Sequence, residues 1–491
     1  MNKKNSKTQK DIFHGEKALV VILGIHGGGV ATAKWLLRRG AQVSVTDERS
    51  PSVLKNSLKL FTSSEKKHIN FILGGQHKKD FQTHDLIVVG PGVPRESEFL
   101  KTAKRVGKKF ENDASLFFRY LTNPIIGVTG TRGKTTTTLW VATLLKKKYT
   151  KVLPSGNNPE NSFLKEFERI NNKDIPAVVE LSSWRLEYLP LSKRAPHISV
   201  ITNLFPDHLN RYGGNITEYA DAKSKIFFDQ HEDDFLILNH DNEWSRYFLN
   251  KKPRSTVFFI SKKQLPKNMN GLFVRKGMMI FRFDEMEQQL MDIERFCDLR
   301  GEHNLENLLA AVLAVKLYDP GVKVTERDIL SLPTPRMRQE VIVDTKKLMV
   351  VNDSCATSPD GTIAAIKRFS RSKRKDLSLI LITGGTDKEL EFEALAKTIA
   401  KNMASQRLIL LEGSATTKLV RKLHTMKSRP PVLATLDECV AKAFEIARES
   451  KRKTTVLFSP GAASFEKFLH EFDRGERFNA LVKKAMKKIV Q

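Results

Sequence analysis

Short apolar runs alternate with amphipathic patterns along most of this 491-residue chain. The first run, ALVVILG (18–24), precedes a glycine triplet and the helical pattern VATAKWLLRRG (30–40), and further apolar runs lie in AQVSVTDE (41–48) and HDLIVVGPGVP (84–94). Such alternation of strand and helix patterns is typical of α/β folds with parallel sheets. We therefore expect an α/β protein whose sheets are mainly parallel.

The same alternation returns twice further along the chain. Apolar runs that we interpret as strands lie at 124–130, 176–183, 197–208, 347–354, 377–385, 407–413 and 454–464. A helical pattern at 304–317 and the proline-bearing stretch LSLPTPRMR (330–338) separate the second group from the third. A single core rarely serves so long a chain. We predict a polar N-terminal tail at 1–15 and three domains at 16–113, 114–334 and 335–491.

Composition changes this picture mainly through charge. The chain carries 83 basic and 55 acidic residues, a formal net charge of +28, which favours polyanionic partners such as nucleic acid, membrane surfaces or phosphorylated substrates. The basic runs are dispersed and hold few aromatic residues, so we interpret them as solvated faces and do not expect nucleic-acid binding. No apolar run approaches the roughly 18–20 residues of a membrane span, no signal core follows the basic N-terminus, and the cysteines are too scattered for a disulfide framework. We expect a cytoplasmic protein.

A glycine-rich turn follows the first apolar run. The stretch GIHGGG (24–29) stands where a dinucleotide fingerprint would, and Asp47 ends the next strand as a ribose-binding acid would. His26 replaces the glycine that lets a pyrophosphate approach the backbone. The turn therefore fits NAD poorly, and both a different nucleotide and a purely structural turn stay open.

A second turn, GVTGTRGKTTTT (127–138), contains half of an ATP-binding loop. Gly133, Lys134 and Thr135 match the end of the widespread G-x-x-x-x-G-K-[ST] pattern, but Val128 stands in place of its first glycine. A tight turn with a Lys-Thr pair at a helix start would present N–H groups, a cation and a hydroxyl to a polyphosphate. The alternative is a polar helix start without a ligand.

Two polar residues follow neighbouring apolar runs of the same block. Glu180 ends AVVEL, and His208 comes after ISVITNL. Because ligands of open α/β sheets bind at the carboxyl ends of strands, these side chains are expected in one crevice with Lys134 and Thr135. Carboxylate, imidazole and hydroxyl groups around a triphosphate suit Mg²⁺, although each residue alone would be an ordinary polar group at a strand end.

A lysine falls on the buried face of an expected helix at 215–230. Lys223 shares a helical stripe with Tyr219 and Phe227. One reading is that its amine reaches past the apolar face to the surface. In the other, burial beside Mg²⁺ lowers the lysine pKa steeply, and the neutral amine takes up CO₂ to form a carbamate that binds metal as a carboxylate would.

These features converge on a known family. In order along the chain stand GVTGTRGKTT, ELSSWRLE, FPDHLNRY, YADAKSKI, GEHNLENLLAA, RMRQEVI, VNDSCATSPDGT, GGTDKELEF and SPGAASFEKFLHEFDRG. Together they resemble the Mur ligases from about residue 18 to the C-terminus, and within that family its D-glutamate-adding branch. The family's ATP loop resembles T-G-T-[NR]-G-K-[ST]-T, so the missing glycine is expected. The resemblance implies a Rossmann-like UDP-binding domain, a central P-loop-type ATPase and a Rossmann-like C-terminal domain.

The resemblance also implies a reaction. An ATP-dependent ligase of peptidoglycan synthesis, expected to be monomeric, would phosphorylate the carboxylate of UDP-N-acetylmuramoyl-L-alanine. The amine of D-glutamate would then attack the acyl phosphate, and Mg²⁺ with two lysines would stabilise the charge that accumulates. The catalytic set implied is Lys134, Glu180, His208, Lys223 and Lys388.

The implied ligand contacts fall into four sets. ATP is assigned to Gly130, Thr131, Arg132, Gly133, Lys134, Thr135, Thr136, Asn304, Asn307, Arg338 and Asp353, of which Asn304 and Asn307 resemble the adenine contacts. The UDP-linked substrate is assigned to Asp47, Arg49, Pro91, Gly92, Asn157 and Ser182. D-glutamate is assigned to Thr357, Lys388, Ser464 and Phe465. The metal is assigned to Thr135, Glu180, His208 and Lys223 as a carbamate.

The chain departs from the family pattern at several positions. Cys355 replaces the family's usual lysine, Gly90 its serine, Arg185 its glutamine and Asn210 its aspartate. Asn158-Pro159 interrupts the family's G-N-I-G loop. These changes bear on rate and substrate details more than on reaction class. We hypothesise that Arg132 or Arg185 partly replaces the charge lost at Cys355.

Four alternatives are weighed against this interpretation. A sister ligase that adds diaminopimelate or lysine typically carries D-N-P-R, which this chain lacks. A folylpolyglutamate synthetase would lack the N-terminal domain that VVILGIHGGG begins. A nucleic-acid-binding ATPase would be stimulated by DNA or RNA and indifferent to D-glutamate. An inactive scaffold would show no turnover, against the complete set of catalytic residues.

Overall fold

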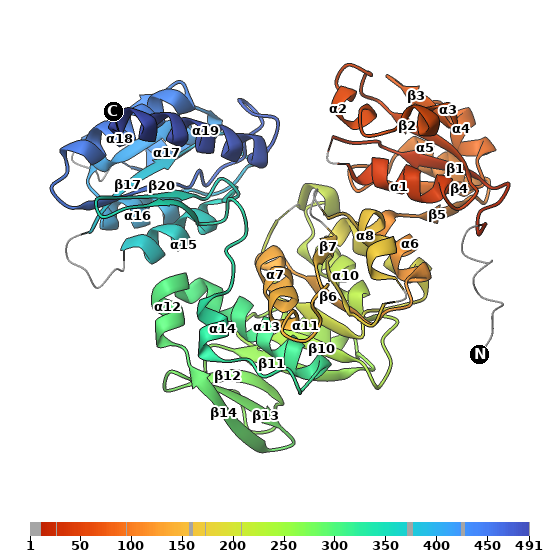
Figure 1. Ribbon diagram of the computed structural model, residues 1–491, viewed down its shortest axis with the longest axis horizontal. Helices are drawn as coiled ribbons and strands as arrows, with labels where there is room; N and C mark the ends of the chain where they lie inside the picture. Colours follow the sequence, from red (N-terminus) through yellow and green to blue (C-terminus); the bar gives the residue numbers. More distant parts are fainter. Residues whose placement is uncertain are drawn as a thin grey trace. The chain divides into compact units, whose positions relative to one another are not determined.

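The computed structural model describes residues 11–25, 27–94, 96–156, 161–171, 173–207, 209–370, 377–423 and 428–490. His26, Asn157, Asn158, Pro159 and His208, which the sequence analysis singles out, lie outside these residues. The chain divides into two compact units: Met1–Ile293 with Glu306–Ser331, and Glu294–Leu305 with Leu332–Gln491. The first unit holds two sheets and the second holds one (Figure 1).

The first sheet is five-stranded, with the order β3-β2-β1-β4-β5, and every neighbouring pair is parallel. Its strands are β1 Lys17–Val21, β2 Gln42–Asp47, β3 Ile69–Leu73, β4 Leu86–Val89 and β5 Lys109–Glu111. The helices of this region are α1 Gly28–Leu37, α2 Lys55–Leu58, α3 Ser63–Lys67, α4 Lys78–Thr83 and α5 Glu98–Arg105. A Cβ on Gly29 would come 2.4 Å from the Leu23 carbonyl oxygen, so α1 packs this close only because residue 29 is a glycine.

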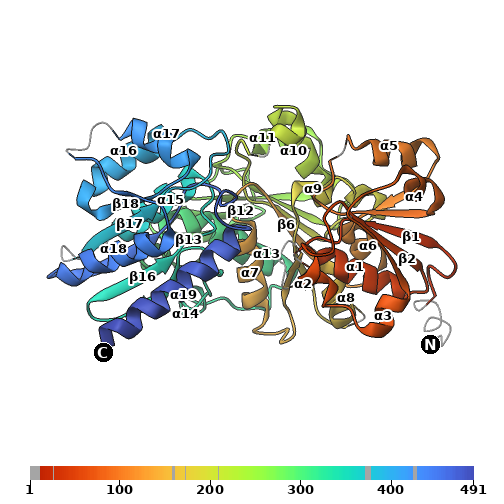
Figure 2. The same ribbon diagram turned by 90° about the horizontal axis from the view of Figure 1, so that it is seen from above.

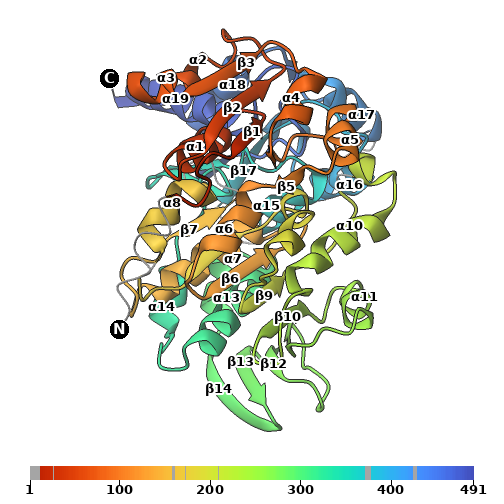
Figure 3. The same ribbon diagram turned by 90° about the vertical axis from the view of Figure 1, so that its right-hand side faces the viewer.

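The second sheet has nine strands in the order β14-β13-β12-β11-β10-β9-β6-β8-β7. They are β6 Ile125–Thr129, β7 Pro154–Gly156, β8 Ala177–Glu180, β9 Ile198–Ile201, β10 Phe235–Asn239, β11 Thr256–Ser261, β12 Gly271–Arg275, β13 Met278–Phe283 and β14 Met286–Asp292. The pairs from β7 to β12 are parallel, and β13 and β14 extend the sheet as an antiparallel meander (Figure 3). This meander is not among the elements predicted from the sequence.

Helices surround the second sheet. They are α6 Asp113–Tyr120, α7 Lys134–Leu145, α8 Phe163–Ile170, α9 Ser183–Leu186, η2 Leu189–Ser192, η3 Leu209–Tyr212, α10 Ile216–Ser224, η4 Lys225–Phe227, α11 Ser245–Asn250, α13 Leu305–Tyr318 and α14 Glu326–Leu330. The helix expected at 215–230 is shorter than predicted, because the α-helical turns stop at Ser224 and a tighter 3₁₀ turn follows.

Within the first unit, α1 packs against α8 (Figure 3). The Trp35 ring lies 5.9 Å from the ring of Phe13 and 5.4 Å from that of Phe167. Arg39 is buried above Trp35, 3.9 Å from its ring centre, and donates a 2.6 Å hydrogen bond to Glu168. Aromatic contacts and a cation over a ring therefore join the helices of the two sheets. Phe13 is buried although it belongs to the predicted polar tail.

The second unit is built on a six-stranded sheet in the order β15-β16-β20-β17-β18-β19. Its strands are β15 Glu340–Asp344, β16 Leu348–Asn352, β17 Leu377–Thr383, β18 Leu408–Leu411, β19 Val432–Leu433 and β20 Lys453–Phe458. Its helices are α12 Glu294–Arg300, η5 Glu302–Asn304, α15 Pro359–Ser370, α16 Glu393–Asn402, η6 Ser405–Arg407, α17 Ser414–Lys422, α18 Leu436–Glu449 and α19 Glu471–Val490. Only β15 is antiparallel to its neighbour among these strands.

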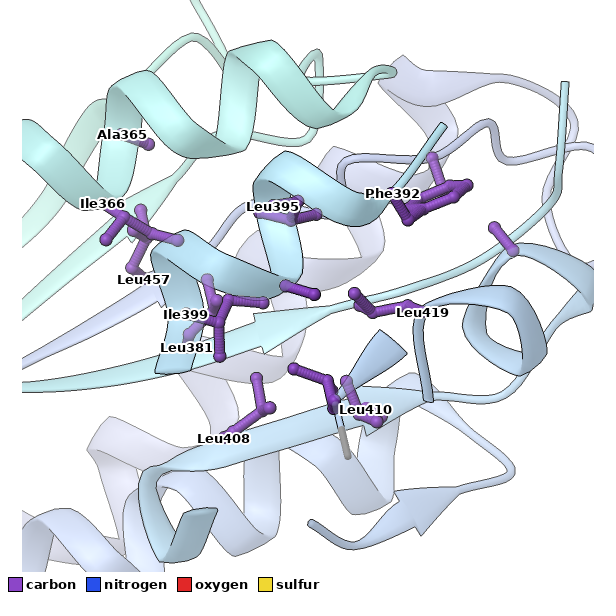
Figure 4. Close-up of a cluster of buried hydrophobic side chains, with 14 of the residues drawn as sticks. Ala365, Ile366, Leu381, Phe392, Leu395, Ile399, Leu408, Leu410, Leu419 and Leu457 are labelled. Carbon is purple, nitrogen blue, oxygen red and sulfur yellow. The ribbon is translucent and has the colours of Figure 1, made fainter. Parts of the chain in front are cut away.

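Both faces of this third sheet are buried. Side chains of β17 alternate: Leu381 faces the cluster with α15, α16 and α17 (Figure 4), whereas Ile380 and Ile382 face α18 and α19. Figure 2 shows these two groups of helices on opposite sides of the sheet. The period of two along a strand explains why one apolar run serves both cores.

The predicted fold class is confirmed: the chain is α/β, with sheets that are mainly parallel. The boundaries at residues 113 and 334 stay predictions. In the described part of the chain no helix has the length and apolar character to cross a membrane, and Cys297, Cys355 and Cys439 form no disulfide.

Candidate functional site

The turn between β6 and α7 closes tightly around two glycines. Gly130 has φ 143° and Gly133 has φ 83°, values that favour glycine. A Cβ on Gly130 would lie 1.9 Å from the Thr202 hydroxyl, and one on Gly133 would lie 2.0 Å from the Asn307 amide oxygen. Asn307 therefore packs directly on the predicted ATP loop, within the first unit.

Two lysine amines meet at one carbonyl of this loop. Lys134 Nζ donates to the carbonyl oxygens of Gly130 and Thr131, each at 3.1 Å. Lys223 Nζ donates to the same Gly130 oxygen at 2.9 Å. Lys134 and Lys223 therefore lie together at the Gly130 carbonyl, and their roles stay predictions.

Lys223 is enclosed on every side. Its side chain is 1% exposed and its amine lies 4.4 Å from the centre of the Tyr219 ring, so the amine does not reach the surface. Burial, followed by the charge of Lys134, holds the pKa of Lys223 well below its ordinary value, against the opposing effects of Asp207 and Glu180. Of the two readings of this lysine, the buried amine is the one that the structure supports.

Two of the other predicted metal ligands lie on different elements, and the third is outside the described residues. Glu180 ends β8, is 5% exposed and lies in register with Val128 of β6. Thr135 is in the first turn of α7. His208 lies outside the described residues, but Asp207 beside it accepts a 2.9 Å hydrogen bond from Arg132. Among the described residues no three His, Cys, Asp or Glu side chains form a metal-binding group.

The loop residues themselves are held from the neighbouring strand. Asn203 accepts from the backbone N–H groups of Thr131 and Arg132 at 2.9 and 2.8 Å, through its carbonyl and its side chain respectively. The Thr131 hydroxyl accepts from the Phe205 N–H at 3.0 Å. Thr136 is buried in the first turn of α7. The segment after β9 thus fixes the shape of the turn.

At the first sheet, Asp47 and Arg49 pair with each other. Asp47 is 2% exposed and accepts from the Arg49 guanidinium at 2.9 and 3.0 Å and from the Gly24 N–H at 3.1 Å. Burial opposes ionisation, but these hydrogen bonds outweigh it and hold the pKa of Asp47 below its usual value. The hydrogen bond from Gly24 thus ties the glycine-rich turn to the end of β2.

Packing explains one departure from the family pattern. A Cβ on Gly90 would lie 2.7 Å from the Val21 carbonyl oxygen and 3.2 Å from Ile22 Cβ. Ile22 has φ 77°, an uncommon conformation for a β-branched residue. Glycine at position 90 makes room for this strained turn beside Pro91 and Gly92, of which Pro91 is half-buried and Gly92 exposed.

A buried ion pair accounts for Arg185. Its guanidinium binds the carboxylate of Asp113 through three contacts of 2.8–3.1 Å, and both side chains are buried. Ser182 accepts from the Arg185 N–H at 3.4 Å as the cap of α9. The charge of Arg185 is therefore matched locally by Asp113, which argues against the hypothesis that it replaces a missing lysine.

The remaining predicted ATP contacts belong to the second unit. Asn304 donates to the Arg300 carbonyl at 2.8 Å, and Arg338 is exposed. Asp353 is buried and accepts from the Gln339 N–H at 2.9 Å and from the Ser459 hydroxyl at 2.7 Å. Burial raises the pKa of Asp353 to about 7 despite these hydrogen bonds and the nearby arginines.

The predicted D-glutamate contacts follow three strands of the third sheet. Thr357 follows β16, Lys388 follows β17, and Ser464 and Phe465 follow β20. Lys388 and Phe465 are exposed, whereas the Ser464 hydroxyl is buried without a hydrogen-bond partner among the described residues. Cys355 is buried, and burial raises the pKa of its thiol to about 11.

One buried charge of this region escapes the sequence analysis. Arg474, in the first turn of α19, is fully buried. Phe478 and Val482 are buried too and share its helical stripe at spacings of four. The same spacing argument that singles out Lys223 would have found Arg474.

Sequence comparisons match both parts of the first unit. The description "Mur ligase MurD-like, N-terminal domain" matches residues 18–110, and "Mur ligase middle domain" matches residues 128–315. A relative from Roseiflexus sp. named UDP-N-acetylmuramoylalanine–D-glutamate ligase is 34% identical over 472 residues, covering 95% of this chain and 98% of the relative. The chain belongs to the Mur ligase family. A relative of the same name from Borreliella burgdorferi is 34% identical over 94% of this Mur ligase and 97% of its own length.

Solved structures agree on the fold of this Mur ligase. The UDP-N-acetylmuramate-alanine ligase of Thermotoga maritima aligns with a TM-score of 0.58 and 18% identity, covering 96% of this chain and 99% of that one. A MurF ligase of Thermotoga maritima in complex with ADP aligns with a TM-score of 0.54 and 17% identity, over 97% and 96%. The expected α/β architecture is therefore shared along nearly the whole chain.

Proposed function

We propose that the protein is an ATP-dependent ligase that joins D-glutamate to UDP-N-acetylmuramoyl-L-alanine in the cytoplasmic part of peptidoglycan synthesis. The observation that carries the proposal is the meeting of two lysine amines, Lys134 and Lys223, at the Gly130 carbonyl. The chain around this site is 34% identical over 95% of its length to a relative that carries the ligase's name. A structural neighbour, the MurF ligase of Thermotoga maritima, was solved in complex with ADP, which supports the proposal of a nucleotide ligand.

In this proposal ATP binds at the start of α7. The N–H groups at the start of α7, from Gly133 to Thr136, would face the phosphates, because the N-terminus of a helix presents backbone donors and a positive dipole end. Lys134 now donates to two backbone carbonyls, and phosphate oxygens would be stronger acceptors for its amine. Asn307, packed on Gly133, would border the nucleotide from α13.

The donor chemistry beside this loop fits Mg²⁺. Thr135 offers a hydroxyl, and Glu180 offers a buried carboxylate whose charge acts on Lys223. Mg²⁺, when bound, would neutralise phosphate oxygens and stabilise the charge that develops during transfer. A protonated Lys223 would repel a cation, but the depressed pKa favours the neutral amine. We propose that its carbamate, together with His208, completes the set of ligands.

The acceptor and the amino acid would bind at the other predicted residues. Asp47, Arg49, Pro91, Gly92, Asn157 and Ser182 are proposed for the UDP-linked substrate. Asn304, Arg338 and Asp353 are proposed for ATP, and Thr357, Lys388, Ser464 and Phe465 for D-glutamate. The buried and unpaired Ser464 hydroxyl supports the last set, because a substrate carboxylate would satisfy it. We also propose that the protein is a monomer and that its domain boundaries lie near residues 113 and 334.

Phosphate release tests the proposal. The purified protein is incubated with ATP, Mg²⁺ and UDP-N-acetylmuramoyl-L-alanine, with D-Glu, L-Glu, D-Asp or L-Lys as the fourth component. We expect release that depends on both substrates and prefers D-Glu. Preference for another amino acid would overturn the assigned substrate, and release stimulated by DNA or RNA without any amino acid would overturn the ligase assignment.

A further inference from the structure

Arg474 lies where three loops of the second unit meet. These loops follow β16, β17 and β20, and they carry Thr357, Lys388 and Ser464, the residues proposed for the amino acid. Arg474 itself is fully buried in the first turn of α19 and has no part in the proposed chemistry.

The guanidinium of Arg474 joins two of these loops directly. Nε donates to the Ser354 hydroxyl at 3.1 Å, and one terminal nitrogen donates to the Ser354 carbonyl at 2.7 Å. The other terminal nitrogen donates to the carbonyls of Ala462 and Ala463 at 3.0 and 2.9 Å. One planar group therefore spans from the residue after Asp353 to the residue before Ser464.

The third loop is joined through a shared carbonyl. The Ala463 oxygen that accepts from Arg474 also accepts from the Thr386 N–H at 3.0 Å, and the Ala463 N–H donates back to the Thr386 carbonyl at 3.0 Å. Gly385 lies against the same guanidinium, because a Cβ there would come 3.4 Å from a terminal nitrogen of Arg474. The loop that carries Lys388 thus rests on the same junction.

We propose that Arg474 is a positioning residue that holds the three amino-acid-binding loops in register and thereby sets the affinity for the amino acid substrate. This inference rests on the proposed function. The fixed fork of the guanidinium matches acceptors in different directions, and the energy of leaving them unpaired in a buried site keeps the loops together. Burial lowers the pKa of Arg474 only to about 10, so the group stays charged at neutral pH.

The ATP side of the same unit has hydrogen bonds of its own. Asp353 is fixed by the Gln339 N–H and the Ser459 hydroxyl, and its own N–H donates to the Phe458 carbonyl at 2.8 Å. None of these contacts involves Arg474. Loss of the guanidinium should therefore change the KM for the amino acid much more than the KM for ATP.

Arg474→Lys and Arg474→Met test the proposal in the full-length protein. Lysine keeps the charge but has a single nitrogen that cannot span both loops, and methionine removes the donors at similar length. Arg477→Gln is the matched control, because Arg477 lies in the same helix and is exposed, where it pairs with Asp473 and lies 5.4 Å from the centre of the Phe468 ring. Ser354→Ala removes one acceptor and tests the junction from the opposite side.

We expect both Arg474 variants to raise the KM for D-glutamate at least tenfold while the KM for ATP changes less than threefold. Ser354→Ala should raise it two- to fivefold, and Arg477→Gln should leave it unchanged. With hydroxylamine replacing D-glutamate, trapping of the acyl phosphate as a hydroxamate should keep its wild-type rate. An unchanged amino acid KM in Arg474→Lys, or equal changes for ATP and amino acid, would overturn the proposal.

The wild-type protein separates this inference from the proposed function. If the wild type prefers an amino acid other than D-glutamate, the substrate assignment is wrong, and the KM for the preferred amino acid decides on Arg474 by the same criterion. Should Arg474→Met not fold, as its circular dichroism would show, Arg474→Lys and Ser354→Ala decide the question. If those two leave the amino acid KM within twofold of wild type, Arg474 is only a structural residue.

Discussion

Lys223 in the first unit and Arg474 in the second are equally buried, yet their surroundings treat the charge in opposite ways. Lys223 donates to the Gly130 carbonyl and stands beside a second amine, and its pKa falls well below the ordinary value. Arg474 donates four hydrogen bonds to oxygen atoms, and burial lowers its pKa only to about 10. Burial shifts the lysine toward its neutral form, whereas the arginine remains a charged link between loops.

Substitution of Lys134, the amine beside Lys223, should have the largest effect on activity. Lys134→Met removes the cation that would stabilise the negative charge of the transferred phosphoryl group. We therefore expect the rate of ATP-dependent phosphate release to fall about 10³-fold. Lys146→Met, at the exposed C-terminal end of α7, is the control and should stay within twofold. A Lys134→Met variant with more than a tenth of the wild-type rate would show that the two amines do not act on phosphate.

A third buried cation, Arg185, differs from Lys223 and Arg474 in that a buried carboxylate, Asp113, binds it directly. Arg185→Gln restores the family residue but leaves Asp113 buried without its cation, so the free energy of unfolding should fall by about 3 kcal/mol. Urea unfolding measures this, and turnover per folded molecule should change less than threefold. Asp113→Asn in the same background should recover part of the loss. A loss below about 0.5 kcal/mol would mean that the pair is no stronger than a surface ion pair.

Substitution of Lys223 tests the first half of the comparison directly. Lys223→Met should lower turnover about 100-fold, because a neutral amine available for carbamate formation is lost. Bicarbonate added to CO₂-depleted buffer should raise the activity of the wild type but not of the variant. A variant with wild-type turnover would remove Lys223 from the proposed site.

Lys223→Met should also change how the free energy of unfolding depends on pH. Since the folded-state pKa of Lys223 lies below its unfolded value, the unfolded state binds more protons between the two. The stability of the wild type should therefore rise with pH across that interval, by up to about 1.4 kcal/mol per pH unit. Below the folded pKa both states are protonated, and this contribution to stability levels off. Lys223→Met should lack this slope when urea midpoints at pH 7 and 9 are compared, and an identical slope in both proteins would contradict the assignment.

The strands, the helices and the ATP loop can be predicted from sequence patterns, but the contacts between distant loops cannot. Lys223 is predictable because Tyr219 and Phe227 mark its helical face. Arg474 has the same signal in Phe478 and Val482, yet its acceptors come from two loops, one 120 residues away in sequence and one 11 to 12 residues away. No local pattern specifies which carbonyls a guanidinium will meet. Gly90 is similar, because the strained φ of Ile22 that requires it arises from packing after folding.

The buried carboxylate of Asp353 gives the mildest test of how burial acts on charge. Burial raises its pKa to about 7, above the unfolded value of 3.8, so between these values the folded state holds a proton that the unfolded state releases. Stability from this group is present at low pH and is lost as pH rises to about 7, by up to about 1.4 kcal/mol per pH unit.

Asp353→Asn should remove that decline, because the amide is uncharged at every pH and keeps an acceptor for the Gln339 N–H. The Ser459 hydroxyl, 2.9 Å from the Thr362 hydroxyl, can turn to accept from the new amide group. Urea unfolding at pH 5, 6 and 7 should show the variant gaining stability relative to the wild type at each step. Parallel curves would mean that Asp353 is ionised throughout, and that its hydrogen bonds, like those of Arg474, suffice to keep a buried group charged.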